Sequence, residues 1–455
     1  MLLLGLDIGT TSICGGLLDT GSGSFVNTVT LPNDAAVPAA HEWQREQDAE
    51  RILEIVADIP ARLGADPGEI ASIGVTGQMH GIVYVDENGQ PLSHLRTWQD
   101  GRGSLPYRDG LSYAAYMSRV TGHKAATGYG SVTLFYDTVN HLVPENAAGI
   151  CTIHDLAVAA LTHTRPVTHA TDAASMGLYD AAHRCFDTQG IKRLGLQPEL
   201  FPTVVGDGYI CGRCAGIPVA SAIGDNQASV LGALADPADS LLVNVGTGSQ
   251  ISCVVPAYTD DPRVDCRPFF DGQYLIAGSS LCGGRAYAIL KNFFADVVGN
   301  VTGNADADIY AAMARAVGTD RRKSPLEVDT AFSGTRADPD KRGCIASVGV
   351  DNFTMKNLCA GVMDGIVNEL YTMYRDIVPL LGGERTRLVG SGNGIRLNPS
   401  LCARFERDFG MNVSIPVHTE EAAFGAALYG AVCAGVFDSV RDARKLIHYR
   451  RDGEQ

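Results

Sequence analysis

The sequence predicts an α/β protein made of two related lobes. Apolar strands alternate with amphipathic helices in both halves of the 455-residue chain, a pattern typical of the α/β class. A strand, a turn of Gly and hydroxyl residues and a second strand near the start of the chain recur near its middle, with Ile8 aligned on Val245. Hydrophobic residues make up 45% and charged residues 19% of the chain, which is ordinary globular composition and supplies enough apolar surface for two cores.

Net charge limits the classes of partner. The chain carries 36 Lys and Arg against 51 Asp and Glu, for a formal net charge of −15 and a sequence pI near 5.1. A general nucleic-acid or anionic-membrane binder needs the opposite sign. We therefore expect neither nucleic acid nor membrane as a partner.

Cysteine usage and the first residues point to a cytoplasmic protein. The 12 cysteines are scattered, unlike a secreted disulfide framework. Cys211 and Cys214 form the one close pair, and half a zinc site or a redox dithiol is the alternative to simple reduced thiols, although a second pair with metal-ligand spacing is missing. The stretch from Met1 to Asp7 lacks a basic region and predicts a buried strand rather than a signal peptide.

The repeated segment predicts two phosphate-binding hairpins. It reads Asp7-Ile-Gly-Thr-Thr-Ser12 in the first copy and Asn244-Val-Gly-Thr-Gly-Ser249 in the second. Small residues let backbone N–H groups approach a phosphate, hydroxyls add donors, and a carboxylate beside them can hold Mg²⁺. Because Asn244 replaces Asp7, only the first copy is expected to hold the metal. Ordinary hairpin turns are the alternative interpretation.

Local periodicity gives the remaining elements. The first half predicts a helix over residues 50–63 followed by a strand over 70–76, and the second half predicts a helix over 358–374 and a strand from 387 into a Gly-rich turn. The segment from 206 to 218 is rich in Gly and Cys and has no helical pattern. We place the lobe boundary there, which gives lobes 1–218 and 219–455.

Three further segments carry candidate chemistry. Asp225 follows an apolar strand and could accept the proton of an attacking hydroxyl, or could cap a helix, and the sequence leaves both open. The turn from Gly390 to Gly394 follows a strand, where an α/β sheet offers a crevice for a nucleoside. Polar clusters at residues 76–81 and 97–102 combine amides, an imidazole, a carboxylate and an indole, which suits a polyhydroxylated ligand.

Together these motifs resemble the ordered motif set of the FGGY family of carbohydrate kinases, from residue 2 to about residue 430. The motifs are Asp7-Ile-Gly-Thr-Thr-Ser12, Gly77-Gln-Met-His-Gly81, Thr97-Trp-Gln-Asp100, Gly224-Asp-Asn-Gln-Ala-Ser229, Asn244-Val-Gly-Thr-Gly248 and Gly390-Ser-Gly-Asn393. The resemblance implies a two-lobed fold of the actin/hexokinase/Hsp70 type, which is ribonuclease H-like, with the active site in the cleft between the lobes. Xylulose kinases of the family share the second motif.

Five stretches, several of them outside the catalytic motifs, resemble family members that phosphorylate sedoheptulose. They are Arg45-Glu-Gln-Asp48, residues 93–102, Ala126-Thr-Gly-Tyr-Gly130, Thr152-Ile-His-Asp155 and Asp172-Ala-Ala-Ser-Met-Gly177. Where many members have a Lys and a Trp in a substrate loop, this chain has Ser131-Val-Thr-Leu-Phe-Tyr136. No contact is carried over to that segment.

The resemblance also implies the roles of individual residues. Asp225 is the general base and, with Asp7, a ligand of Mg²⁺. The residues implied to bind ATP are Thr10, Thr11, Ser12, Gly246, Thr247, Gly248, Gly283, Gly284, Gly392, Asn393 and Asn398. The residues implied to bind the sugar are Gln78, Met79, His80, Trp98, Asp100 and Asn226.

The expected function is ATP-dependent phosphorylation of a terminal hydroxyl of a ketose, converting sedoheptulose to its 7-phosphate. A kinase of the pentuloses xylulose or ribulose is the alternative within the same class. A non-catalytic ATP-binding sugar sensor on the same fold is the alternative from a different class. A small-molecule ketose and ATP are the expected partners, and a homodimer is left open.

Overall fold

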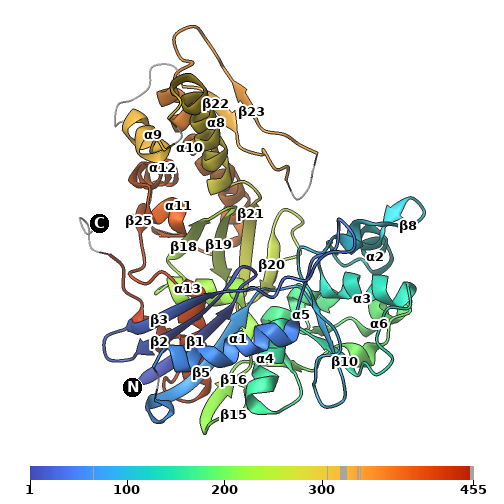
Figure 1. The fold of residues 1–455 in the computed structure, drawn as a ribbon. Helices are drawn as coiled ribbons and strands as arrows, with labels where there is room; N and C mark the ends of the chain where they lie inside the picture. Colours follow the sequence, from blue (N-terminus) through green and yellow to red (C-terminus); the bar gives the residue numbers. More distant parts are fainter. Residues whose placement is uncertain (65, 305, 318–324, 336–337, 339, 451–455) are drawn as a thin grey trace. The chain divides into compact units, whose positions relative to one another are not determined.

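The computed structural model describes residues 1–64, 66–304, 306–317, 325–335, 338 and 340–450 (Figure 1). The chain forms two compact units that interleave in sequence. Unit 1 comprises Met1–Ala235, Arg267–Tyr274 and Glu420–His448, and unit 2 comprises Asp236–Cys266, Leu275–Thr419 and Tyr449–Gln455. Residues 219–235 thus pack with the first unit, and the lobe boundary at residue 218 stays a prediction about the sequence repeat.

Unit 1 is built on a mixed sheet with the strand order β15-β16-β5-β1-β2-β3, and β17 also pairs with β5. Strand β1 runs antiparallel to β2 and parallel to β5. Its apolar sequence fits a strand that is covered on both faces. The strands are β1 (Leu2–Ile8), β2 (Ser12–Asp19), β3 (Ser24–Pro32), β5 (Ile70–Gly77), β15 (Ile210–Cys214), β16 (Ile217–Ala220) and β17 (Ile223–Gly224).

Helices cover both faces of this sheet. Successive residues of a strand point to opposite faces, and a Cβ atom on Gly15 would meet Ile59 of α1 (Ala49–Arg62), whereas one on Gly5 would meet the backbone of α13 (Glu421–Cys433). Helix α4 (Ile153–Thr162) lies beside α1 (Figure 1). Helix α1 confirms the helix predicted over 50–63, and β5 confirms the strand predicted over 70–76.

The rest of unit 1 consists of short strands and helices. Residues 131–136 belong to α3, where Phe135 and its neighbours pack in a second apolar core. The elements are β4 (Glu46–Gln47), β6 (Val83–Val85), β7 (Leu95–Arg96), β8 (Pro106–Arg108), β9 (Leu111–Ser112), α2 (Tyr113–Thr121), α3 (Gly130–Val139), β10 (Gly149–Cys151), β11 (Thr168–His169), α5 (Ala170–Met176), β12 (Tyr179–Asp180), β13 (Cys185–Phe186), α6 (Thr188–Arg193), β14 (Val204–Val205), α7 (Asp225–Ala233) and α14 (Val440–Ala443).

Unit 2 has a second sheet with the order β20-β21-β19-β18-β24-β25. Its strand β18 runs antiparallel to β19 and parallel to the much later β24, as β1 does with β2 and β5, so the repeated motif marks equivalent places in two related sheets. The strands are β18 (Ser240–Val245), β19 (Ser249–Val255), β20 (Asp265–Pro268), β21 (Tyr274–Ser280), β24 (Arg387–Ser391) and β25 (Asn412–Ser414).

A layer of helices accompanies this second sheet. Helix α10, which contains the helix predicted over 358–374, packs against α8, α9 and α12 (Figure 1). The elements are α8 (Gly284–Thr302), α9 (Ile309–Val317), β22 (Glu327–Asp329), β23 (Cys344–Ala346), α10 (Met355–Ile377), α11 (Asn393–Arg396) and α12 (Pro399–Phe409).

The state of the cysteines and the presence of membrane-spanning helices concern the whole described chain. All 12 cysteines lie within the described residues and are free thiols, with Cys211 and Cys214 partly buried on β15. In the described parts of the chain, no helix combines the length and the apolar character needed to cross a membrane.

Replacing Gly74 by Ala should destabilise unit 1. A Cβ atom at this position would lie 1.8 Å from the carbonyl oxygen of Ala426 in α13, so the helix must move away from β5. We expect a loss of at least the ~1–3 kcal/mol typical of an overpacked core, measured by urea unfolding. Gly206→Ala is the control because nothing lies within 4 Å of that site. Equal stability of the two variants would contradict the close contact between α13 and β5.

Candidate active site

Strand β5 brings the two predicted catalytic carboxylates to one edge of the first sheet. Thr76 pairs with Asp7 of β1 on one side and with Ile223 of β17 on the other, and its hydroxyl donates to the Ile223 carbonyl at 2.6 Å. Asp225 follows β17 directly. The ends of β1 and β17 therefore present both carboxylates on either side of β5.

Asp225 does not cap the helix that it begins. Gly224 is the N-cap residue of α7, and no side chain makes a capping hydrogen bond there. A Cβ atom on Gly224 would lie 2.5 Å from the Met79 methyl group, so glycine lets the buried Met79 pack under this turn. The helix-cap interpretation of Asp225 is wrong, because Asp225 is the first residue of α7 and not its N-cap.

The environment of Asp7 and Asp225 disfavours their negative charges. Loss of water contact raises the pKa of Asp7 to about 7, and the charges of Asp225 and Glu420 add to this effect. Loss of water contact also raises the pKa of Asp225 to about 6, opposed by the positive charge of His154. Neighbouring carboxylates that repel one another are suitable oxygen ligands for a hard divalent cation, so these two residues fit Mg²⁺.

A buried ionisable cluster lies close to these carboxylates, and the sequence interpretation did not assign it a role. His154 Nε2 lies 2.9 Å from Asp172 Oδ1, and both side chains have no exposed surface. Asp155 is the third member, and one nitrogen or oxygen atom from each residue lies within 4.8 Å of the other two. Burial lowers the pKa of His154, but the neighbouring carboxylates of Asp172, Asp155 and Asp225 together raise it, to about 9. In the sequence, the stretches 152–155 and 172–177 stood out only through their resemblance to family members, which gave no role for these side chains.

Hydrogen bonds join two predicted sugar residues to the first hairpin. The Trp98 indole N–H donates to Thr10 Oγ1 at 2.9 Å, and Thr10 Oγ1 lies 3.3 Å from Gln78 Oε1. Gln78 donates to Gln47 at 2.8 Å, and Gln47 donates to the Thr10 carbonyl at 2.8 Å. Gln78 is buried and supports the turn, whereas Trp98 is 46% exposed and offers an apolar face to a ligand.

His80 is held in a specific orientation. Its φ angle of 75° lies in the left-handed region, a conformation that non-glycine residues adopt mainly at functional sites and turns. Its backbone N–H donates to Ser175 Oγ at 3.1 Å, its Nδ1 lies 2.7 Å from the Ser175 carbonyl oxygen, and its ring stacks on Tyr129. A carbonyl can only accept, so Nδ1 carries a proton and the imidazole plane is fixed.

Asp100 has a structural interaction that its sequence motif did not reveal. The side chain is fully buried, and its oxygens accept hydrogen bonds from the Arg102 side chain at 2.7 Å and the Arg45 backbone N–H at 3.0 Å. These bonds hold the loop that carries Trp98. Asn226, the neighbour of Asp225, is partly exposed at the start of α7.

The first hairpin leaves its hydroxyl residues accessible. Asn33 holds the turn by donating to the Gly9 carbonyl at 2.9 Å, while Thr11 is exposed and Ser12 is partly exposed. Its strands pair Ile8 with Ile13, with four residues between them. These residues form a turn of the kind predicted to approach a phosphate.

The second hairpin, in unit 2, is one residue tighter, because Val245 pairs directly with Ser249. Gly284 N–H donates to the Gly246 carbonyl at 2.8 Å, and a Cβ atom on Gly283 would lie 2.4 Å from the Gly248 carbonyl oxygen. Gly283 and Gly284 therefore let the start of α8 pack on the turn. Gly246 and Thr247 remain exposed.

The predicted adenosine residues lie next to this turn within unit 2. Strand pairing places Ser391 beside Asn244, and a Cβ atom on Gly392, whose φ is 78°, would lie 2.6 Å from the Val245 carbonyl oxygen. Asn393 is exposed at the start of α11, and Asn398 accepts from Leu401 N–H at 3.1 Å as the N-cap of α12. The Gly-rich turns therefore meet at the ends of two parallel strands, where α/β sheets bind nucleotides.

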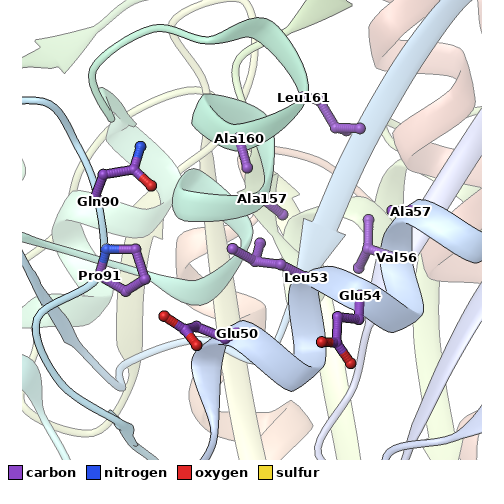
Figure 2. Close-up of a pocket in the computed structure, with 10 residues that line it drawn as sticks. All are labelled: Glu50, Leu53, Glu54, Val56, Ala57, Gln90, Pro91, Ala157, Ala160 and Leu161. Carbon is purple, nitrogen blue, oxygen red and sulfur yellow. The ribbon is translucent and has the colours of Figure 1, made fainter.

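A hollow of about 390 Å³ on the surface of unit 1 is separate from these groups. Figure 2 shows its lining side chains, which come mainly from α1 and α4, with Glu50 and Glu54 among them. None of the residues predicted to bind sugar, ATP or Mg²⁺ lines this hollow.

Comparisons with known proteins identify the family of this chain. The N-terminal domain model of the FGGY family of carbohydrate kinases matches residues 2–242. Human sedoheptulokinase is 30% identical, and the alignment covers 94% of this chain and 96% of that protein.

Solved structures confirm the fold class. A xylulose kinase from Rhodospirillum rubrum superposes with a TM-score of 0.84 at 19% identity, over 99% of this chain and 93% of that one. Plasmodium falciparum glycerol kinase with ADP gives a TM-score of 0.79 at 17% identity, over 98% and 92%. The chain belongs to the FGGY family of carbohydrate kinases.

Proposed function

We propose that this kinase transfers the γ-phosphoryl group of ATP to the terminal hydroxyl of sedoheptulose, giving sedoheptulose 7-phosphate. The observation that carries the proposal is the placement of Asp225, which begins α7 without capping it and lies across β5 from Asp7. The similarity to human sedoheptulokinase along nearly the whole chain supports the choice of sugar.

Asp225 acts as the general base in this mechanism. Its carboxylate accepts the proton of the attacking hydroxyl while that oxygen forms a bond to the γ-phosphorus and the bond to the leaving ADP oxygen breaks. Since its pKa is raised to about 6, the group is mostly ionised at pH 7.5 and is a stronger base than an ordinary aspartate.

Side chains of unit 1 bind the sugar. The exposed face of Trp98 covers its carbon backbone, and the oriented His80 and the amide of Asn226 recognise its hydroxyls. Met79 shapes the pocket, while Gln78 and Asp100 hold the two loops in place through the hydrogen bonds described above.

Each unit carries residues that we assign to ATP binding. In unit 1 these are Thr10, Thr11 and Ser12, for the phosphates. In unit 2 residues 246–248 are assigned to the phosphates, and Gly392, Asn393 and Asn398 to the adenosine. Mg²⁺ held by Asp7 and Asp225 would neutralise charge on the phosphates.

A panel of sugars tests the substrate. With saturating ATP and Mg²⁺, we expect kcat/KM for sedoheptulose to exceed that for D-xylulose and D-ribulose by roughly 10-fold or more, a difference of about 1.4 kcal/mol in transition-state binding. ADP formation is the measurement. A preference for xylulose would identify a pentulose kinase, and sugar binding without any sugar-dependent ADP formation would identify a sensor.

Asp225→Asn should lower kcat by roughly 10²- to 10⁴-fold, because the amide cannot accept the proton. Sugar affinity, measured by isothermal titration calorimetry, should change much less. Asp236→Asn, a carboxylate without a predicted role, is the control. Near-normal turnover of the Asp225 variant would remove this residue from the mechanism.

Asp7→Asn should make the metal-free protein more stable at pH 7.5 while impairing catalysis. Because the pKa of Asp7 is raised from 3.8 to about 7 by folding, the unfolded state ionises first, and stability falls as pH rises from about 4 to 7. We expect the variant to melt about 5 °C higher at pH 7.5, with no difference near pH 4. Equal melting temperatures at pH 7.5, or an unchanged Mg²⁺ dependence of activity, would contradict this assignment.

A further inference from the structure

The buried pair of His154 and Asp172 has no part in the mechanism so far. The two residues come from α4 and from the first turn of α5, their ring nitrogen and carboxylate oxygen lie 2.9 Å apart, and neither is exposed. Burying such a pair costs desolvation energy that its mutual attraction often fails to repay. General stability therefore does not explain why the chain buries this pair.

Asp172 is linked through the adjacent residue to the segment that carries Asp225. The Thr171 hydroxyl accepts a hydrogen bond from the Gly224 backbone N–H at 3.1 Å. Gly224 is the residue immediately before Asp225, and its own partner in the sheet is Gly77 of β5. The first turn of α5 thus holds both the strand end before Asp225 and the carboxylate that pairs with His154.

His154 lies against the same point from the α4 side. A Cβ atom on Gly77 would be 3.2 Å from His154 Nδ1 and 2.8 Å from the Ile8 carbonyl oxygen. Gly77 pairs with Ile8, the neighbour of Asp7, and with Gly224. The imidazole therefore packs beneath the junction of the three strands that present Asp7 and Asp225.

The surrounding charges define what His154 contributes. Asp155, Asp172 and Asp225 all act on His154 electrostatically, and Asp7 is in turn affected by His154. Glu420 adds another negative charge near Asp7, and Arg267 is the other positive group acting on Asp225. A positive imidazole offsets this excess of carboxylates, whereas a neutral one would leave it uncompensated.

A metal ion is the alternative occupant of this cluster, because His154, Asp155 and Asp172 could each offer one ligand atom. A metal requires a ring nitrogen without a proton. His154 Nε2 and Asp172 Oδ1 lie at ion-pair distance, although not in hydrogen-bond geometry, and Asp155 and Asp225 also act on the ring. This cluster of carboxylates favours the charged imidazolium, and binding of a metal to the ring would contradict it.

We propose that His154, as an imidazolium paired with Asp172, is a positioning residue of the phosphoryl transfer, which holds the ends of β5 and β17 and offsets the charge of Asp7 and Asp225. The inference rests on the proposed function and extends it to residues that touch neither substrate. According to this proposal, the positive charge of His154 contributes to turnover in addition to the packing of its ring.

Kinetics of three variants test the proposal. His154→Gln removes the charge and should lower kcat by about 10- to 100-fold with less than about threefold change in the KM of the sugar, while His154→Lys restores the charge and should return kcat to within about fivefold of the parent. His183→Gln is the matched control, because His183 forms an exposed pair with Asp180. A folded His154→Gln variant with parental kcat, or a folded Lys variant no better than Gln, would overturn the proposal.

Histidine NMR on the unaltered protein covers the cases in which variants fail to fold or no tested sugar is phosphorylated. Of the 11 histidines, one ring should remain an imidazolium at pH 8, and its signal should not change on addition of Zn²⁺ or Mn²⁺ after chelator treatment. Absence of any ring charged at pH 8, or a metal bound at this ring, would refute the imidazolium pair. Failure of the sugar panel with the pair intact would instead count against the proposed function alone.

Discussion

Parallel pairing of β1 and β17 with β5 is the constraint on which the candidate site depends. Thr76 and Gly77 are flanked by Asp7 and Ile8 on one side and by Ile223 and Gly224 on the other. A shift of β5 by one residue would turn each of these side chains to the opposite face. The Thr76 hydroxyl donates to the Ile223 carbonyl and supports the short strand β17 in this register. The spacing of Asp7 and Asp225 therefore follows from strand pairing and not from contacts between the two carboxylates.

This arrangement has an electrostatic cost. Burial raises the pKa of both Asp7 and Asp225, and the negative charge of Asp225 adds to the rise for Asp7, so folding disfavours the two charges. A Mg²⁺ site needs carboxylate oxygens that are not already paired directly with Arg, as Asp100 is with Arg102, because such a pair leaves little affinity for a cation. If Asp7 and Asp225 hold Mg²⁺ as proposed, stability and metal binding make opposite demands on the same two residues.

The sequence predicted those features that depend on local pattern. Strands, the helices at 50–63 and 358–374, and both hairpins follow from periodicity and turn residues, and the family motifs identified the kinase fold. Roles set by distant partners were not predictable: Asp100 binds Arg45 N–H from 55 positions away, and Gly283 and Gly284 pack on a turn of another strand. The sequence alignment of the two hairpins also did not reveal that the second turn is one residue shorter. The aligned residues are similar, but the strand pairs that close the two turns differ.

The last segment of unit 1, Glu420–His448, contains α13 and affects both the packing of the sheet and the candidate site. Glycines at positions 5 and 74 let α13 approach β1 and β5 at backbone distance, and Gly425 and Gly232 do the same between α13 and α7. The alternation of side chains places Gly5 and Asp7 on the same face of β1, and Glu420, which precedes α13, acts on Asp7. The helix that completes the core of unit 1 therefore also brings a further carboxylate towards the candidate metal ligand. The glycines that let α13 pack closely are therefore as much a condition for the candidate site as the motifs that carry its charges.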